Sequence, residues 1–410
     1  MLCEGLGELN TRVPVLVVNH ENNGILGEVT VSLSGNCKLT GILLTLITCY
    51  GNAVCLKSIV HTKPFAQHHP MVVISTCNGV EFASSPILSS GDKISNATMG
   101  GFSPTYRDAF VNGSLTYLVA KYSAHLAPIF AAAVNAVETG EVMRNADGTA
   151  LHLSISTWAI QTLEEYDEMS AVDSISADHP TVRKINIDKF FDPTSPDFGA
   201  EKLAEWVSNS TKENIKELYA LNGSNAAEDE ASYRQGQEIK CGIIAPSSIN
   251  DQVGKYITYI QDYLAKAYNV TILPLGSVTS VNTQSMVAKQ LCNQGADFII
   301  SLQDDTDRNN AAKICNELGV YFAIGGSCQN EIDYAEIKNL PYYIGSIGTS
   351  TAEERRSAYE MTEYYLQCLI HRAEGDLEEY QIEYKGLTVN TEEPVAFIPT
   401  RREDEEAWLC

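Results

Sequence analysis

The chain has 410 residues, a length that favours two or three domains over one, and 44% of its residues are hydrophobic and 20% charged. This is a globular composition, and it excludes disorder or a fibrous repeat along the whole chain. The formal net charge of −24 at pH 7 disfavours binding to nucleic acid or to an anionic membrane surface, because phosphate groups repel so acidic a protein.

No segment is predicted to cross a membrane. The longest apolar stretch, Gly41–Cys55, is shorter than the roughly 18 residues that a spanning helix needs, and polar residues interrupt it. The first residues lack the basic and then apolar pattern of a signal peptide, so no export signal is predicted in this chain.

The cysteines and histidines predict no metal site and no cofactor. The 11 cysteines are scattered, and none stands in a Cys-x-x-Cys pair. Cys292 and Cys315 occupy apolar positions of helical patterns, and Cys241 lies in a strand-like run. Buried thiols of this kind are usually inert, so the pattern favours reduced structural cysteines over a disulfide framework. The histidine-rich stretch 61–69 is interpreted as solvated surface.

In chain order, the first half alternates strand-like and helix-like patterns, which indicates an α/β layer. Strands are predicted at 13–18, 71–75, 94–99, 115–120 and 151–155, and helices at 105–111 and 124–137. Residues 21–60 are ambiguous.

The second half is more regular. Apolar strands begin near residues 239, 270, 297 and 320, and a helical pattern follows each of the first three. This is the spacing of strand–helix units, and nearly continuous apolar strands indicate a parallel sheet covered by helices on both faces. The predicted fold class is therefore α/β, with two doubly wound layers. The predicted organisation is a domain at 1–220, a linker at 221–238, a domain at 239–370 and an acidic C-terminal segment at 371–410.

Polar residues follow the strands of the second half, at the edge where open parallel sheets bind ligands. The candidate ligand-binding residues of this half are Ser247, Ser248, Asn250, Gln303, Asp304, Asp305, Gly326 and Ser327. Ser247, Asp305 and Thr306 are each equally compatible with a role as a helix cap, since Ser, Asp and Thr are preferred at that position. Four such loops along one sheet edge favour a ligand cleft.

Motifs of known enzyme classes are mostly absent. The sequence contains no Gly-x-Gly-x-x-Gly, no phosphate-binding loop and no Gly-x-Ser-x-Gly elbow. Asp304-Asp-Thr-Asp307 follows an apolar strand as a phosphotransferase nucleophile does, but the spacing of its acids and threonine is wrong for that chemistry. We therefore predict a protein that is not an enzyme and that has no catalytic residues.

Several longer stretches match the pattern of a known family. In the second half they are the opening strand with Pro246-Ser-Ser, 290–301, 312–324 and 341–347. In the first half they are 71–79, 97–102 and 110–123. Residues 239–370 resemble the N-terminal lobe of type 1 periplasmic solute-binding proteins of ABC importers, the simple-sugar-binding kind, and residues 71–170 resemble the second lobe. The lobes thus stand in reversed order along the chain.

This resemblance implies two Rossmann-like lobes that close over a small, sugar-like solute. Asn78, Phe102, Lys121 and Tyr122 would contribute to the site from the second lobe, with Phe102 and Tyr122 stacking on a sugar face. Closure about a hinge would be detected by an ABC permease, and the protein would work outside the cytoplasm, in the periplasm or at the cell surface. The alternatives are an intracellular ligand-sensing domain related to sugar-responsive repressors and, third, a small-molecule enzyme.

Two structural expectations follow. The loops at Asn78, Phe102 and Tyr122 should face the loops of the second half. Of Asp304 and Asp305, one should cap a helix that begins near Thr306 and the other should face the cleft, because two adjacent side chains cannot both cap one helix.

Overall fold

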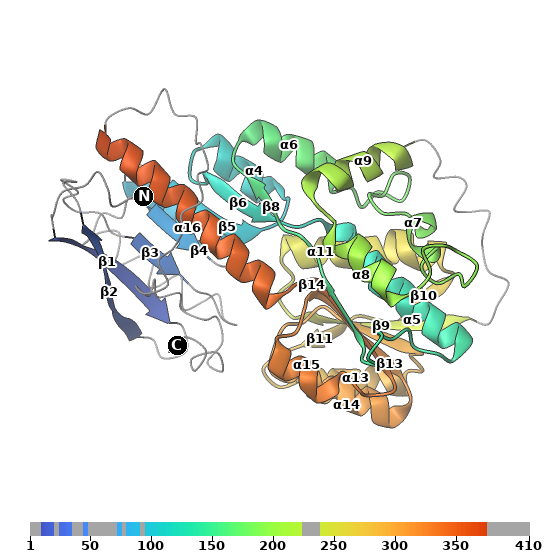
Figure 1. Ribbon diagram of the computed structural model, residues 1–410. Coiled ribbons are helices and arrows are strands. Elements are labelled where there is room, and N and C mark those ends of the chain that lie inside the picture. The colour runs from blue at the N-terminus through green and yellow to red at the C-terminus, as the bar shows by residue number, and fades with distance from the viewer. Residues whose placement is uncertain are drawn as a thin grey trace.

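The computed structural model describes residues 10–19, 24–34, 44–47, 72–75, 79–90, 95–223 and 238–374. Two sheets organise these residues (Figure 1). The first has the strand order β2-β1-β3-β4-β5-β6-β8. Its strands are β1 (Asn10–Asn19), β2 (Gly24–Ser34), β3 (Leu44–Ile47), β4 (Val72–Ser75), β5 (Ser95–Gly100), β6 (Tyr117–Ala120) and β8 (Trp158–Ile160). The inner pairs are parallel, while β2 and β8 pair antiparallel with their neighbours.

The second sheet is parallel throughout, in the order β10-β9-β12-β13-β14-β7, with β11 paired to β9. Its strands are β7 (Leu151–Ser154), β9 (Ile239–Pro246), β10 (Val270–Ile272), β11 (Gly276–Val278), β12 (Phe298–Ser301), β13 (Tyr321–Ser327) and β14 (Tyr343–Thr349). The predicted α/β class is thereby confirmed, with one sheet parallel throughout and the other parallel except at its two edge strands.

Helices cover both faces of the second sheet because alternate residues of its strands point to opposite sides. In β12, Phe298 and Ile300 belong to one hydrophobic core, whereas Ile299 belongs to the other. The first core includes residues of α5 (Ala127–Thr139) and α11 (Asp251–Tyr259). The second includes residues of α13 (Gln284–Asn293), α14 (Arg308–Leu318) and α15 (Glu331–Ile337).

Some of the remaining described helices were predicted from the sequence, and others were not. The predicted helix at 105–111 is α4 (Pro104–Val111), and the predicted helix at 124–137 is the 3₁₀ turn η1 (Ser123–Leu126) followed by α5. A π-helical turn, Ile260–Leu264, joins α11 to α12 (Ala265–Ala267). The sequence patterns did not identify α3 (Gly79–Ser90), α6 (Leu163–Val172), α7 (Lys184–Asp188), α8 (Ala200–Ser208) or α9 (Lys212–Asn222).

Of the connections between the two sheets, three lie entirely within the described residues. The first leads from β6, in the first sheet, through η1 to α5, which packs on β13 and β14 of the second. The second, Ile155–Thr157, returns from β7 to β8. The third leads from β14 into the long helix α16 (Thr351–Glu374), which contacts β4 and appears in red-orange in Figure 1. Between β8 and β9 the chain crosses a fourth time, through α6 to α9 and then through residues 224–237, which lie outside the described residues.

The predicted domain at 1–220 stays a prediction, but one part of it joins the other sheet. Strand β7 pairs with β14, residue Gly345 opposite Leu151. The segment from η1 to β7 therefore lies with the second sheet, although it precedes that sheet in the sequence. Most of the predicted linker and of the acidic C-terminal segment lies outside the described residues. Within the described part of the chain, no helix is both long enough and apolar enough to span a bilayer.

Candidate functional site

The carboxyl ends of strands from the two sheets meet at Lys121. This residue directly follows β6 of the first sheet, and its Nζ donates a hydrogen bond of 2.5 Å to the carbonyl oxygen of Gly326, near the end of β13 in the second. Burial lowers the pKa of Lys121, and the nearby carboxylates of Glu354 and Asp304 oppose that effect. Parallel strands expose ligand-binding loops at this end, so the contact lies where a site is expected in both sheets.

Gly326 makes this contact possible. Its φ of +88° is in the range that favours glycine, and a Cβ there would lie 3.1 Å from the ring of Tyr256. The backbone can therefore turn its carbonyl toward Lys121 while Tyr256 of α11 packs beneath it.

A buried carboxylate, Asp173, joins elements of both sheets. It follows α6, and its Oδ1 accepts from the backbone N–H of Ser123 at 2.5 Å. Its Oδ2 accepts from the Ser123 hydroxyl at 3.1 Å and from Lys255 Nζ of α11 at 2.9 Å. Burial raises the pKa of Asp173, and the charge of Lys255 opposes the rise. With three donors the carboxylate is well satisfied, which is the condition for keeping a charge inside a protein.

The loop after β5 also touches α11. A Cβ on Gly101 would lie 1.5 Å from Oε1 of Gln252, so only glycine allows this approach. Gln252 in turn donates to the Ser123 hydroxyl at 3.1 Å. Its place in the first turn of α11 is fixed by Asn250, whose side chain caps that helix by accepting from Val253 N at 2.9 Å.

We refer to Lys121, Ser123, Asp173, Gln252, Lys255 and Gly326 as the junction cluster. Its members come from β6, η1, the end of α6, α11 and β13. Each hydrogen bond between them joins residues at least 50 positions apart in the sequence. The cluster therefore exists only when both sheets are assembled. Its chemistry is that of positioned hydrogen-bond donors and acceptors.

Aromatic side chains pack against one another next to the junction cluster. Tyr122 is fully buried and stacks on Trp158 with ring centroids 5.4 Å apart. His125 lies edge-on to Tyr256 at 5.1 Å, and its Nδ1 is hydrogen-bonded to the carbonyl of Tyr122. Burial and the charge of Lys121 lower the pKa of His125 to about 3, so the imidazole is neutral at pH 7. Its Nε2 is buried and has no hydrogen-bond partner.

A second polar group follows β12 and β13. Arg308, at the start of α14, is 2% exposed, and it donates from NH1 to the Ser327 hydroxyl at 3.0 Å. Its NH2 lies 3.2 Å from Oδ1 of Asp304, a side chain that is 54% exposed. Asp305 instead accepts from Gln284 Nε2 of α13 and from the backbone N–H of Asp307, both at 2.9 Å. Asp304 thus lies on the open side of this loop and Asp305 on the inner side.

The helix after this loop differs from the sequence expectation. It begins at Arg308 rather than near Thr306, and its N-cap residue Asp307 makes no side-chain capping bond. Asp305 holds the turn before the helix, and Asp307 accepts from the backbone N–H of Ser285 in α13. The two acids therefore tie two neighbouring helices together in addition to shaping the turn.

The predicted site residues fall into several groups. Lys121 and Gly326 are in direct contact, and Ser327, the residue after Gly326, accepts a hydrogen bond from Arg308. Ser247 and Ser248 are exposed, and Asn250 serves as a helix cap. Gln303, Asp304 and Asp305 line the loop after β12. Phe102 and Tyr122 are buried in the core, where Phe102 packs against Trp158 and Tyr166. Asn78 lies outside the described residues.

Four residues of the junction cluster were not predicted: Ser123, Asp173, Gln252 and Lys255. No local motif marks them, since their partners are distant in the sequence. The available signal was the position of Gln252 and Lys255 in the first two turns of the helix after β9. Polar side chains at the carboxyl end of a sheet strand are candidates for ligand contacts.

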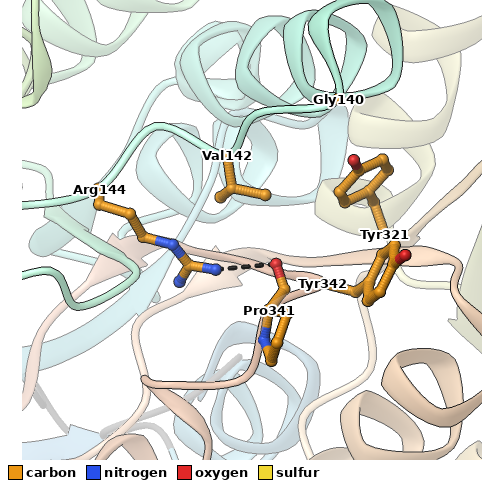
Figure 2. Close-up of a pocket in the computed structure, with 6 residues that line it drawn as sticks. All are labelled: Gly140, Val142, Arg144, Tyr321, Pro341 and Tyr342. Atoms are coloured by element: carbon orange, nitrogen blue, oxygen red, sulfur yellow. Dashed lines mark hydrogen bonds between the residues drawn. The ribbon is translucent and has the colours of Figure 1, made fainter.

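A separate pocket of about 280 Å³ lies elsewhere on the second sheet (Figure 2). Its lining residues are Gly140, Val142, Arg144, Tyr321, Pro341 and Tyr342. Tyr321 begins β13 and Tyr342 precedes β14, so the pocket is at the opposite end of these strands from the junction cluster. Arg144 donates to the carbonyls of Leu340 and Pro341, each at 2.9 Å. These hydrogen bonds hold the backbone before β14, so the arginine has a structural role. We therefore place the candidate site at the junction cluster.

The described residues contain no group of three or more His, Cys, Asp and Glu side chains placed to hold a metal ion. No protein-family model and no curated protein matches the chain. Among solved structures, the chain is similar to a chain of the GsuK channel, with a TM-score of 0.35 and 10% sequence identity. The match covers 90% of this chain and 66% of the channel chain, and at this TM-score it supports no conclusion about function.

Proposed function

We propose that the protein binds a small polar solute between its two sheets and does not convert it chemically. The observation that carries this proposal is the hydrogen bond from Lys121 at the end of β6 to Gly326 at the end of β13. It joins the ligand-binding edges of two sheets, and such edges at an interface between lobes are a preferred place for small-molecule sites.

The polar groups at this junction suit hydroxyls and amides. Lys121 offers three ammonium donors, of which Gly326 accepts one, and Gln252 offers both an amide donor and an acceptor. Ser327 and Asp304 stand at the adjoining strand ends. A solute that enters when the sheets separate would replace the direct bonds between them with its own hydrogen bonds. The favourable free energy of binding would then favour closure.

The three crossover segments that lie entirely within the described residues support a hinge. At the second and third of them, Thr157 donates to Glu353 Oε1 from its backbone N–H at 2.6 Å and from its hydroxyl at 2.8 Å. Ser154 also donates to the hydroxyl of Ser350 at 2.8 Å. In hinge closure, a few residues at the ends of helices or strands absorb the backbone rotation while the two sheets move as rigid bodies. The crossover residues are in such positions.

The biological setting is proposed from the sequence resemblance. The solute would be sugar-like, the protein would act outside the cytoplasm, and an ABC permease would receive the closed form. Under this proposal the junction cluster is the part of the molecule that differs between the open and closed states.

The test is a thermal-shift screen against sugars, nucleosides and amino acids. A solute at about 100 times its dissociation constant adds about 2.7 kcal/mol to the unfolding free energy, which is an easily measured shift. Lys121→Met should abolish the shift, since it removes the ammonium group that meets the solute. Lys189→Met is the matched control, because it removes an exposed lysine whose partner is Asp197.

Circular dichroism melts without solute establish that both variants fold. Full response of the native chain and of Lys189→Met, with loss in Lys121→Met, supports the proposal. A screen in which no solute stabilises the native chain, or in which Lys121→Met responds as strongly as the control, contradicts it.

A further inference from the structure

Two thiols face each other between neighbouring helices of the second sheet. The Sγ atoms of Cys292, near the end of α13, and of Cys315, in α14, are 3.9 Å apart. The two helices pack against each other on the same face of the sheet. Cys315 is fully buried, whereas Cys292 is only half-buried. A disulfide bond is about 2.05 Å long, so side-chain rotation has to close a gap of about 2 Å.

We propose that Cys292 and Cys315 are a redox-active dithiol, which a small-molecule disulfide oxidises to a disulfide bond between α13 and α14. In the first step the Cys292 thiolate attacks one sulfur of the reagent and releases one small thiol. In the second, the sulfur of Cys315 attacks Cys292 Sγ and displaces the second small thiol. Two protein thiols are oxidised, one reagent disulfide is reduced, and the two protons end on the released thiols.

The geometry assigns the attacking role to Cys292. It is the more accessible of the two, and its hydrogen bond with Cys315 lowers its pKa. The same hydrogen bond, together with burial, raises the pKa of Cys315. The thiolate is the reactive form of cysteine, so oxidation starts at the half-buried residue and is completed by its buried neighbour.

The other described cysteines lack these features. Cys241 is buried and donates to the carbonyl of Gly242, and burial raises its pKa. Cys328 is buried against the carbonyls of Leu153 and Gly348, and burial raises its pKa to about 12. They serve as internal controls in the same molecule.

The bond would close a loop between residues 23 positions apart, around β12 and the loop that follows it. It would lie in the second halves of α13 and α14, whereas Gln284 and Ser285, which contact Asp305 and Asp307, lie at the start of α13. Oxidation should therefore raise the unfolding temperature without altering the loop at the strand end. This inference does not depend on the proposed function.

The experiment incubates the folded, full-length chain with oxidised glutathione, blocks remaining thiols by alkylation and maps the tryptic peptides. Cleavage at Lys289, Arg308, Lys313 and Lys338 places Cys292 in one peptide and Cys315 with Cys328 in another. We expect these two peptides to be linked, lighter by two hydrogens than their sum, and separated by reduction. The oxidised chain should also melt at a higher temperature than the reduced chain.

Variants identify the partner. The link should persist in Cys328→Ser and disappear in Cys315→Ser and in Cys292→Ser, while all three melt cooperatively. If Cys315→Ser fails to fold, Cys315→Ala and the Cys328→Ser result still decide the pairing. Absence of the link in the native chain, or its persistence in Cys315→Ser, would overturn the proposal.

Discussion

The second sheet and the junction between the sheets are held together by different kinds of contact. Within the second sheet, strands β9, β12, β13 and β14 follow one another as strand–helix units, and contacts such as that of Asp305 with Gln284 span 21 positions. At the junction, Lys121 and Gly326 are 205 positions apart and Gln252 and Ser123 are 129 apart. Local sequence pattern specifies the first kind, whereas only the assembled fold specifies the second.

The largest expected effect tests the pairing of β14 with β7, two strands of the second sheet that lie far apart in the sequence. Gly345→Ala in β14 should destabilise the protein by about 4–5 kcal/mol. A Cβ there would lie 2.2 Å from the backbone oxygen of Leu151 in β7, and the φ of +141° is strained for any other residue. Urea unfolding followed by circular dichroism measures the change.

Gly140→Ala is its matched control. This glycine ends α5 with a φ of +75°, but no atom lies within 4 Å of a Cβ built on it. It should cost only about 1 kcal/mol, the cost of the left-handed backbone alone. Equal losses of unfolding free energy in the two variants would mean that the close approach of β7 to Gly345 of β14 does not contribute to the cost.

These contacts also mark how far the sequence alone can lead. The apolar runs near 239, 297 and 320 identified β9, β12 and β13, because a strand buried on both faces is apolar along its length. The pattern at 151–155 identified β7 as a strand but not its sheet. Pairing with β14 depends on a register between residues nearly 200 positions apart, and no local pattern encodes it.

The candidate site was predicted only in part for the same reason: local sequence pattern does not encode contacts between distant residues. Gly326 was predicted because it follows an apolar strand, and Lys121 because the family resemblance implies a site there. Their direct contact is a property of the assembled sheets. Asp173 follows a helix that the patterns did not identify, so its role could not be inferred. Tyr122 was expected to stack on a sugar because the family resemblance implies a sugar site and its ring is aromatic. Its stacking partner in this structure, Trp158, lies on β8, a strand that the sequence did not reveal.

The second prediction tests the ion pair that joins the two regions. Lys255→Met should cost about 3 kcal/mol, because it leaves the fully buried Asp173 carboxylate without its counter-charge. Combining it with Asp173→Asn should recover part of that loss. Thermal and urea unfolding of the two single variants and the double variant give the coupling free energy.

Arg107 and Asp167 provide the control pair. They are linked by Nε–Oδ1 and NH2–Oδ2 hydrogen bonds of 2.7 and 2.8 Å, but both side chains are more than 40% exposed. Arg107→Met should leave the unfolding midpoint nearly unchanged, since solvent screens an exposed pair. A Lys255→Met variant as stable as Arg107→Met would show that the buried pair does not hold the sheets together.

The third prediction is a pH dependence that arises at the junction. His125 has a pKa of about 3 in the folded protein because of burial and the nearby Lys121, against about 6.5 when unfolded. The unfolded chain therefore binds the proton first, and stability falls as the pH drops below about 6.5. Between pH 7 and pH 5 the loss from this residue should be about 2 kcal/mol.

Comparison of the native chain with His125→Phe isolates this contribution. The variant lacks the titrating group and keeps an aromatic ring, so its stability should change less over the same pH range, although its stability at pH 7 is lower. Urea unfolding at each pH provides the measurement. Parallel pH profiles for the two proteins would assign the dependence to other groups.

The smallest expected effect concerns the local contacts of the second sheet. Asp305→Ala should cost about 1 kcal/mol, because Gln284 and the N–H of Asp307 lose their acceptor. Asp305→Asn keeps an oxygen at Oδ1 and should cost less. Neither variant should weaken solute binding, since Asp305 lies on the inner side of the loop.

Asp304, 54% exposed at the strand end, should behave differently. If it accepts solute hydroxyls, each bond is worth about 1.5–3 kcal/mol, and Asp304→Ala should weaken binding about ten- to a thousandfold. Asp304→Asn, which retains an oxygen beside Arg308, separates loss of charge from loss of the acceptor. Calorimetric titration with a solute found in the screen, together with urea unfolding, measures both effects. Unchanged affinity in Asp304→Ala would remove this loop from the site and confine solute recognition to the long-range contacts of the junction cluster.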